Sequence, residues 1–168
     1  ISSLTRALAG LDAKPPETPD DKLQIEVLSE TLRDKLREQI LVDRARARLL
    51  QGAAGAQDKA LKDAEAASAA AKGLSWRASA IQGSILAERG RVFEAVAQFE
   101  LAIKVSEKSG PRAQAEAYCA LAEGYLTCDL PGPAGVAAAK AAAFDAGSLL
   151  AMVQRAEAKE RLLDYVKA

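Results

Sequence analysis

The sequence contains no histidine, and this absence excludes several kinds of site. Histidine is the commonest general base and metal ligand, and Ser–His or Cys–His catalytic pairs cannot form without it. Only two cysteines are present, Cys119 and Cys128. On one helix they would be about 13 Å apart along the axis, which excludes a direct disulfide between them. They are too few for a metal site, so we interpret them as small buried apolar residues.

Long apolar runs are also absent, and we therefore predict no membrane span. Neither sign of charge is in excess, since 23 Lys and Arg residues balance 23 Asp and Glu residues. A nucleic-acid partner requires a basic face, so we expect none. Residues 15–30 are mainly acidic and residues 33–48 mainly basic. We interpret these segments as solvated helix faces; the alternative is a docking surface for an acidic partner.

Catalytic motifs are missing too: the sequence has no Walker phosphate loop, no Gly-x-Gly-x-x-Gly after a strand and no Gly-x-Ser-x-Gly. Its carboxylates occur beside Lys and Arg at helical spacings, as Glu100 and Lys104 do. We therefore predict that the chain is not an enzyme and has no catalytic residue, no cofactor and no metal. Because the first residue is Ile1 rather than Met, we expect a fragment or a processed mature form.

Aromatic residues make up only 4% of the chain, and alanine supplies much of its apolar content. Alanine is the best helix former, and a core of Ala and Leu requires helices packed at close range. No segment alternates convincingly with the period of a strand. The composition therefore predicts an all-α fold.

The spacing of apolar residues and breakers divides the chain into a short N-terminal part, residues 1–19, and a helical domain, residues 20–168. Ser2 and Ser3 can cap a short helix, and the Pro-rich stretch 14–19 should run extended. A long helix should begin at Asp20 or Asp21 and either continue to about Leu50 or break near Asp43. Further breaks are expected at these positions: 52–55, Gly73, Gly90, Gly110–Pro111, 131–133 and Gly147.

One segment of this domain has the spacing of a known repeat. The segment has a small residue, a bulky one three positions later, a turn glycine, a second small residue, an aromatic and a third small residue. These are Gly83, Leu86, Gly90, Ala95, Phe99 and Ala102. This order resembles the tetratricopeptide repeat (TPR), in which a small residue in helix A lies where helix B crosses closely. A second copy follows at a shift of 39 residues, with Tyr118, Leu121, Ala122, Tyr125, Ala134, Ala138 and Ala141. The usual period is about 34 residues, so the chain resembles the longer variety, with about 40 residues per repeat.

The outer parts depart from this pattern. In the second copy Cys128–Pro131 replaces the turn glycine and Ala138 replaces the aromatic. An earlier copy is recognisable at Ala60, Ala64 and Ala67, but Arg48 stands where a small residue is expected. The resemblance thus implies a TPR-like solenoid with repeats at 40–73, 75–109 and 111–146, and a capping helix over 148–167 whose outer face is polar. The apolar side of that cap would comprise Leu149, Leu150, Val153, Ala156, Leu162, Leu163 and Val166. Another helical-hairpin stack or bundle is the alternative.

The resemblance also implies a function, because TPR arrays hold a peptide or a partner helix in a concave groove lined by their A helices. The groove positions would be Ala45, Leu49, Arg77, Ala80, Ser84, Ala87, Glu116, Cys119, Glu123 and Leu126. Chaperone-binding TPR proteins hold a terminal carboxylate with a Lys and Asn clamp, which this Asn-free chain lacks. Glu116 and Glu123 favour a basic or mixed partner, or are simply solvated. Trp76 either packs between hairpins or is an exposed anchor.

We therefore expect a non-catalytic protein-interaction scaffold or adaptor. The alternative is a structural subunit of a larger multiprotein complex, whose N-terminal arm binds a neighbouring chain. A helical enzyme or small-molecule sensor ranks last, because Ala-rich hairpins leave little room for a deep pocket.

Overall fold

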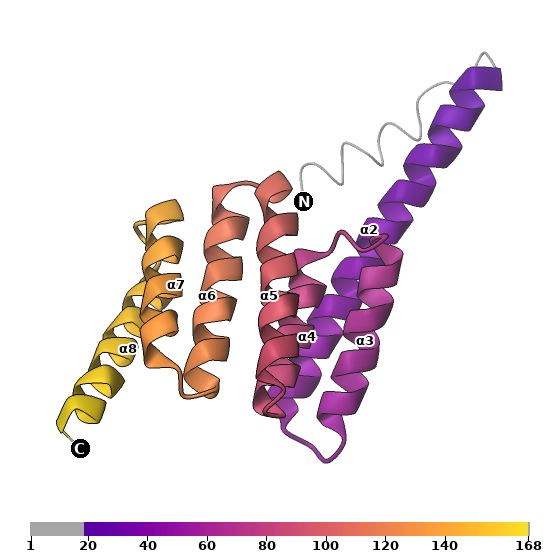
Figure 1. Cartoon of the computed structure of the whole chain (residues 1–168). Helices are drawn as coiled ribbons and strands as arrows, with labels where there is room; N and C mark the ends of the chain where they lie inside the picture. Colours follow the sequence, from indigo (N-terminus) through magenta and orange to yellow (C-terminus); the bar gives the residue numbers. More distant parts are fainter. Residues whose placement is uncertain (1–18, 168) are drawn as a thin grey trace. The chain divides into compact units, whose positions relative to one another are not determined.

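The computed structural model describes residues 19–167, and within them the chain is helical without any strand (Figure 1). The predicted all-α class is confirmed. The helices are α2 (Pro19–Gln51), α3 (Ala56–Ala70), α4 (Trp76–Glu88), α5 (Val92–Ser106), a 3₁₀ turn η1 (Glu107–Ser109), α6 (Pro111–Thr127), α7 (Pro131–Phe144) and α8 (Leu149–Lys167). The short helix expected near Ser2 and most of the Pro-rich stretch lie outside the described residues.

The chain divides into two units, Ile1–Asp34 and Lys35–Ala168. In the first, the described residues form the opening turns of α2. Helix α2 runs without interruption to Gln51, so the alternative of a break near Asp43 is wrong. The physical reason is that no Gly or Pro follows Pro19 until Gly52, and proline is tolerated in the first turn of a helix.

The helix ends coincide with most of the expected breaks. Gly73 and Gly90 adopt positive φ angles of 79° and 71°, where the chain leaves α3 and α4. The break expected over residues 131–133 lies earlier, because Pro131 is the first residue of α7. The turn is formed instead at Asp129, whose φ of 57° is in the left-handed region that Asp tolerates better than most residues.

From α3 onward, each helix of the second unit packs against the next one in the sequence, and α4 also packs on α6 and α6 on α8. The core is correspondingly divided into successive clusters. Leu41, Val42 and Ala45 of α2 meet α3 and α4, whereas Leu126 meets Ala134 of α7 and Ala158 of α8. Because most buried side chains are alanines, the helices can approach closely. Among the described residues, none of the helices combines the length and apolar character that crossing a bilayer requires.

Among the described residues, the largest fully buried side chain is Phe99 of α5, which is only 1% exposed. Its ring lies between two glycines, Gly83 of α4 and Gly124 of α6. A Cβ atom added at Gly83 would lie 2.8 Å from Cε1 of the ring, and one at Gly124 would lie 2.7 Å from Cζ. The prediction of a close crossing at Gly83 thus matches the observed geometry. Gly124, on the other side of the same ring, was not identified from the sequence.

Asp63 of α3 connects α3 to α2. Its carboxylate, in a residue that is 4% exposed, accepts hydrogen bonds from Arg44 at 2.9 and 2.7 Å and from Arg48 at 2.5 Å. The side-chain hydrogen bond from Arg44 lowers the pKa of Asp63, against the opposing effect of burial. Arg48, which departs from the repeat pattern, therefore serves as a partner for a buried carboxylate.

Helix α8 presents the opposite face to the core from the one we expected. The buried positions are Ala151, Gln154 and Ala158, whereas the larger apolar side chains Leu149, Val153 and Leu163 are 73%, 53% and 58% exposed. Ala156, Leu150 and Leu162 are exposed too, and the side chain of Val166 is outside the described set. The prediction of a cap with a polar outer face is therefore wrong.

The physical reason lies in the surface that α8 covers. The neighbouring positions Ala134 and Ala141 of α7 are small, so alanines of α8 fit against them better than leucines would. Gln154 and Arg161 fix the rotation of α8, because they donate hydrogen bonds to the carbonyl oxygens of Cys119 and Leu126 on α6, at 3.1 and 2.8 Å.

Candidate partner-binding surfaces

Several residues that we expected to line a groove are buried in the core. Ala45 and Cys119 are 0% and 3% exposed, and Ala80, Ala87 and Leu126 are buried as well. These side chains lie at the contacts between neighbouring helices, so they offer no surface to a partner, and their assignment to the groove is corrected. The TPR pattern placed them by their spacing along one helix, and that spacing does not show which positions the adjacent helix covers.

Trp76 is also buried, being 6% exposed, and it packs among small residues of α4, α5 and α6 such as Ala80, Ala102 and Ala117. Its position agrees with the packing interpretation and contradicts that of an exposed anchor. The guanidinium carbon of Arg77 lies 4.8 Å from the centre of the indole ring, a cation–π contact that covers the ring further.

The remaining expected groove residues are at least partly accessible. Arg77, Glu116 and Glu123 are exposed, whereas Ser84 and Leu49 are half-buried. Two of them already have partners within the chain. Ser84 donates to the carbonyl oxygen of Ala80 at 3.1 Å, and Glu116 pairs with Arg112 at 3.3 Å. Ser84 and Glu116 are therefore already engaged within the chain.

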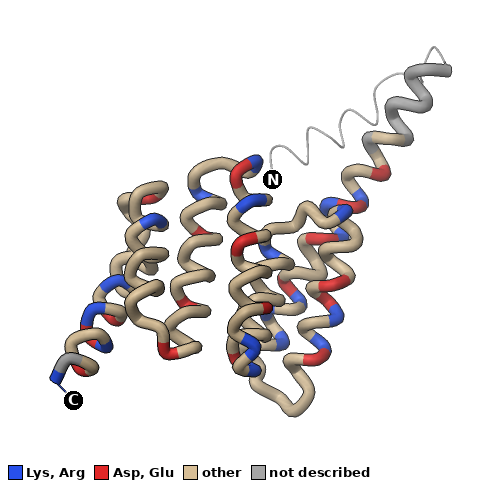
Figure 2. The backbone as a smooth tube through the Cα atoms, viewed as in Figure 1, with Lys and Arg blue, Asp and Glu red and all other residues tan. Residues whose placement is uncertain are grey.

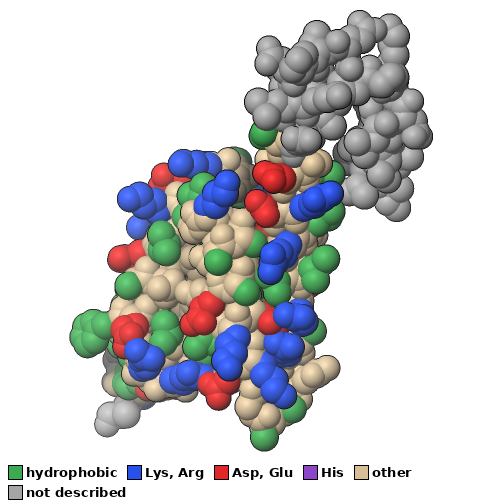
Figure 3. Space-filling model, turned by 90° about the vertical axis from the view of Figure 1, so that its right-hand side faces the viewer, with side chains coloured by type: hydrophobic (Ala, Val, Ile, Leu, Met, Phe, Trp, Pro, Cys, Tyr) green, Lys and Arg blue, Asp and Glu red, His purple; other side chains and the backbone are tan. Residues whose placement is uncertain are grey.

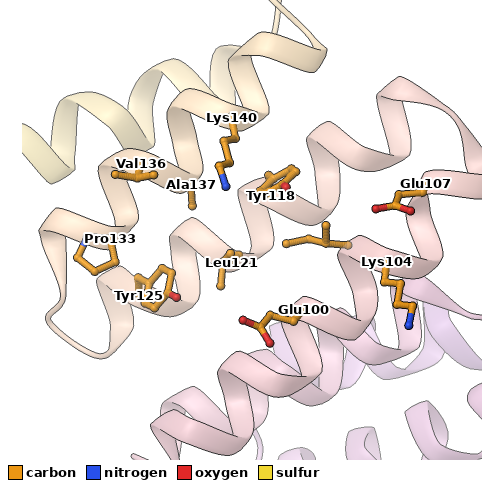
Figure 4. Close-up of a pocket in the computed structure, with 11 residues that line it drawn as sticks. Glu100, Lys104, Glu107, Tyr118, Leu121, Tyr125, Pro133, Val136, Ala137 and Lys140 are labelled. Carbon is orange, nitrogen blue, oxygen red and sulfur yellow. The ribbon is translucent and has the colours of Figure 1, made fainter.

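An open recess lies between α5, α6 and α7, and we call it the α5–α7 groove (Figure 4). It has a volume of about 680 Å³. Its lining consists of Glu100, Ile103, Lys104, Glu107, Tyr118, Leu121, Tyr125, Pro133, Val136, Ala137 and Lys140. Helix α6 supplies an apolar and aromatic floor, while α5, η1 and α7 supply the charged residues of the rim.

The aromatic floor is held in place by neighbouring side chains. Tyr118 stacks on Phe144 with ring centres 5.7 Å apart and an angle of 12° between the ring planes. Lys140 Nζ lies 5.6 Å from the centre of the Tyr118 ring, and Figure 4 shows these two side chains pointing toward one another. The rim combines two carboxylates, Glu100 and Glu107, with two ammonium groups. Such a recess is complementary to an apolar segment flanked by charges of both signs.

Sequence reasoning missed this groove. Tyr118, Leu121 and Tyr125 were assigned to the packing within a hairpin, although only Leu121 of the three is buried and both tyrosines are partly accessible. The available signal was the spacing of two tyrosines seven residues apart on α6, because side chains at that spacing share one face of a helix.

The thiols have the character of packing residues. Burial raises the pKa of both Cys119 and Cys128, and a higher pKa leaves less of the nucleophilic thiolate at neutral pH. Both are free, which agrees with the prediction that they do not form a disulfide. In the described part of the chain, no group of three or more acidic or thiol side chains is placed to hold a metal ion.

Charges of both signs are mixed over the surface. Figure 3 shows Lys and Arg side chains beside Asp and Glu side chains over one face, and Figure 2 shows the same alternation along α3 to α6. Helix α7 differs, since Lys140 is its one charged residue. Comparison of the chain with protein-family models, with curated proteins and with solved structures finds no match.

Proposed function

We propose that this chain is a non-catalytic scaffold or adaptor module of the TPR-like type, which binds a peptide or a helix of another protein. The sequential packing of helices supports the proposal, because each helical hairpin shares its core with the next. The enclosure of Phe99 between glycines of α4 and α6 supports it further, since the small residue of the repeat pattern lies at that helix crossing.

The observation that carries the function is the α5–α7 groove. Its floor exposes parts of Tyr118 and Tyr125, and aromatic side chains are enriched where proteins bind one another. A partner helix or extended segment would place apolar side chains on this floor and mixed charges along the rim. The proposed binding surface is therefore this groove rather than the polar residues that α4 and α6 expose.

Site-specific photocrosslinking in native extract tests the proposal. A photoreactive phenylalanine analogue replaces Tyr125 in the groove or, as a matched control, the exposed Tyr165 of α8. We expect a stoichiometric protein partner to be captured from position 125 and not from position 165. Because Glu100 and Lys104 lie on the rim, the charge-swapped variant E100K/K104E should reduce this capture without changing the net charge.

The outcomes separate the two surfaces. Capture only from a crosslinker at Arg77 would place the partner on α4 and α6, as the repeat pattern implies, and would refute the groove. If position 125 captures no protein, or if E100K/K104E leaves the capture unchanged, the scaffold function proposed for this groove is wrong.

A second candidate, a structural subunit that uses its N-terminal arm, is favoured by one observation. Helix α2 exposes large apolar side chains, with Val27 55%, Leu36 40% and Ile40 63% exposed. Such side chains are expected to be covered in a complex. Hydrogen exchange of the isolated chain tests this candidate. Protection of residues 1 to 30 in a monomer would contradict it, because the arm would already be folded and covered without a neighbour.

A further inference from the structure

A second recess lies on the other side of α7, between α7 and α8, and we call it the α7–α8 groove. Its volume is about 500 Å³. Its floor is apolar and made mainly of small residues, with Gly135 and Ala139 from α7 and Ala158 and Leu162 from α8. Val136, which is 60% exposed, stands between this groove and the α5–α7 groove. The floor is thus shallow enough for the backbone of another helix to approach closely.

The charges that line this groove are all of one sign. Lys140 of α7 and Arg155 and Lys159 of α8 are exposed along it, and no carboxylate belongs to its lining. Within the part of the chain that the structure describes, none of the three forms an ion pair, although the Lys140 ammonium lies over the ring of Tyr118 in the α5–α7 groove. Arg155 and Lys159 are four residues apart on α8, a spacing at which like charges repel and weaken the helix. An anionic partner would relieve this repulsion.

Gly135 keeps the floor of this groove low. A glycine inside a helix is less stable than alanine, because it loses more conformational entropy on folding. The packing of this chain does not require a glycine there, because a Cβ added at Gly135 would lie 3.6 Å from Cβ of Ala158, an ordinary van der Waals contact. Gly83 and Gly124, in contrast, face the ring of Phe99. The missing side chain at Gly135 thus leaves the floor low beside Ala158, where the α7–α8 groove lies.

From these observations we propose that the α7–α8 groove binds an acidic amphipathic helix of another protein. Apolar side chains of that helix would lie over Gly135 and Ala139, and its carboxylates would pair with Arg155 and Lys159. This is the binding mode in which one amphipathic helix enters the groove of another protein. The floor has no aromatic ring on which nucleic-acid bases could stack, and it is recessed between two helices rather than projecting toward a bilayer.

The inference shares with the proposed function only the assumption that the ligand is a protein segment. Its test is a selection of displayed random peptides of about 15 residues, similar in length to α7, on the full chain. We expect enrichment of peptides that carry apolar residues three and four positions apart and an excess of Asp and Glu. Their affinity should fall about tenfold or more in R155E/K159E, since two charge-assisted contacts become repulsive.

A matched control removes the general effect of charge. The variant K59E/K62E changes the net charge equally on α3, where both lysines are exposed, and it should leave the affinity within about twofold. The variant Ala139→Gln adds a long neutral side chain to the floor at an exposed helical position, and it should weaken binding without changing the charge. Thermal unfolding of each variant confirms that the chain still folds.

The affinities of the enriched peptides for the variants decide between the two grooves. Enriched peptides without an acidic excess, or affinities that R155E/K159E and K59E/K62E reduce equally, would overturn the inference. It would also be overturned if anionic phosphatidylserine vesicles or duplex DNA bound through Arg155 and Lys159 in preference to the peptides. Peptides that respond to E100K/K104E alone would support the proposed function and refute the α7–α8 groove. Peptides whose affinity falls in R155E/K159E alone would support the α7–α8 groove and leave the α5–α7 groove without a ligand among them.

Discussion

Replacing Gly124 by alanine tests the close contact on which the packing of α4, α5 and α6 depends. In the interior of an exposed helix this substitution stabilises a protein by about 0.5–1 kcal/mol, because alanine has less conformational entropy to lose. At Gly124 the added Cβ would overlap the ring of Phe99, with 2.7 Å to Cζ and a shorter approach to Cε2. The ring cannot retreat, because Gly83 faces its other side.

The expected magnitude follows from these two opposing effects. Overpacking a well-filled core costs about 1–3 kcal/mol. After subtracting the gain in helix propensity, we expect Gly124→Ala to destabilise the chain by up to about 2.5 kcal/mol, with a central value of about 1 kcal/mol. Gly135→Ala is the matched control, because its Cβ makes only an ordinary contact with Ala158, and it should stabilise by about 0.5–1 kcal/mol.

Urea unfolding followed by far-ultraviolet circular dichroism measures both changes, and an unchanged dependence on denaturant shows that the folded states are comparable. A double-mutant cycle with Phe99→Leu isolates the contact. The smaller side chain should reduce the cost of Gly124→Ala, which gives a non-additive term of about 0.5 kcal/mol or more. If Gly124→Ala stabilises the chain as much as Gly135→Ala does, Phe99 is not enclosed as described, and the reasoning on this helix crossing fails.

Two further predictions concern single groups. The pKa of Asp63 is lowered in the folded chain, chiefly by the hydrogen bond from Arg44. The stability that Asp63 contributes is therefore complete above its unfolded pKa of roughly 4. This stability is lost as the pH falls through the lower pKa of the folded chain. Urea midpoints should therefore decline below about pH 4 in the wild type and less steeply in Asp63→Asn, which should already be about 1–3 kcal/mol less stable at neutral pH. Equal slopes would contradict this role of Asp63. Cys128 is half-buried and Cys119 is buried, and the pKa of each thiol is raised. A thiol reagent should therefore label Cys128 first, and Cys119 only as the chain unfolds. Labelling of both at the rate of an unfolded control would contradict the burial of Cys119.

Local physical chemistry, read from the sequence alone, determined the helices and most of their ends. Alanine-rich segments favour helix, and glycines at positions such as Gly73 and Gly90 end helices because they accept positive φ angles. The resemblance of the segment with Gly83 and Phe99 to a known repeat also implied a close approach of α4 and α5, and the ring of Phe99 does lie against Gly83. These features depend on residues near one another in the chain, and the sequence displays them directly.

Contacts between distant residues were decided only by the tertiary structure. The need for Gly124 became visible when α6 was seen to cover the far side of the Phe99 ring. Trp76 and Cys119 could not be placed from spacing, because the neighbouring helix determines whether a position on a helix is buried. The same holds for α8, whose amphipathic pattern has two possible faces. The alanines of α7 and the carbonyl oxygens of α6 select the face with small residues and leave the larger apolar side chains exposed.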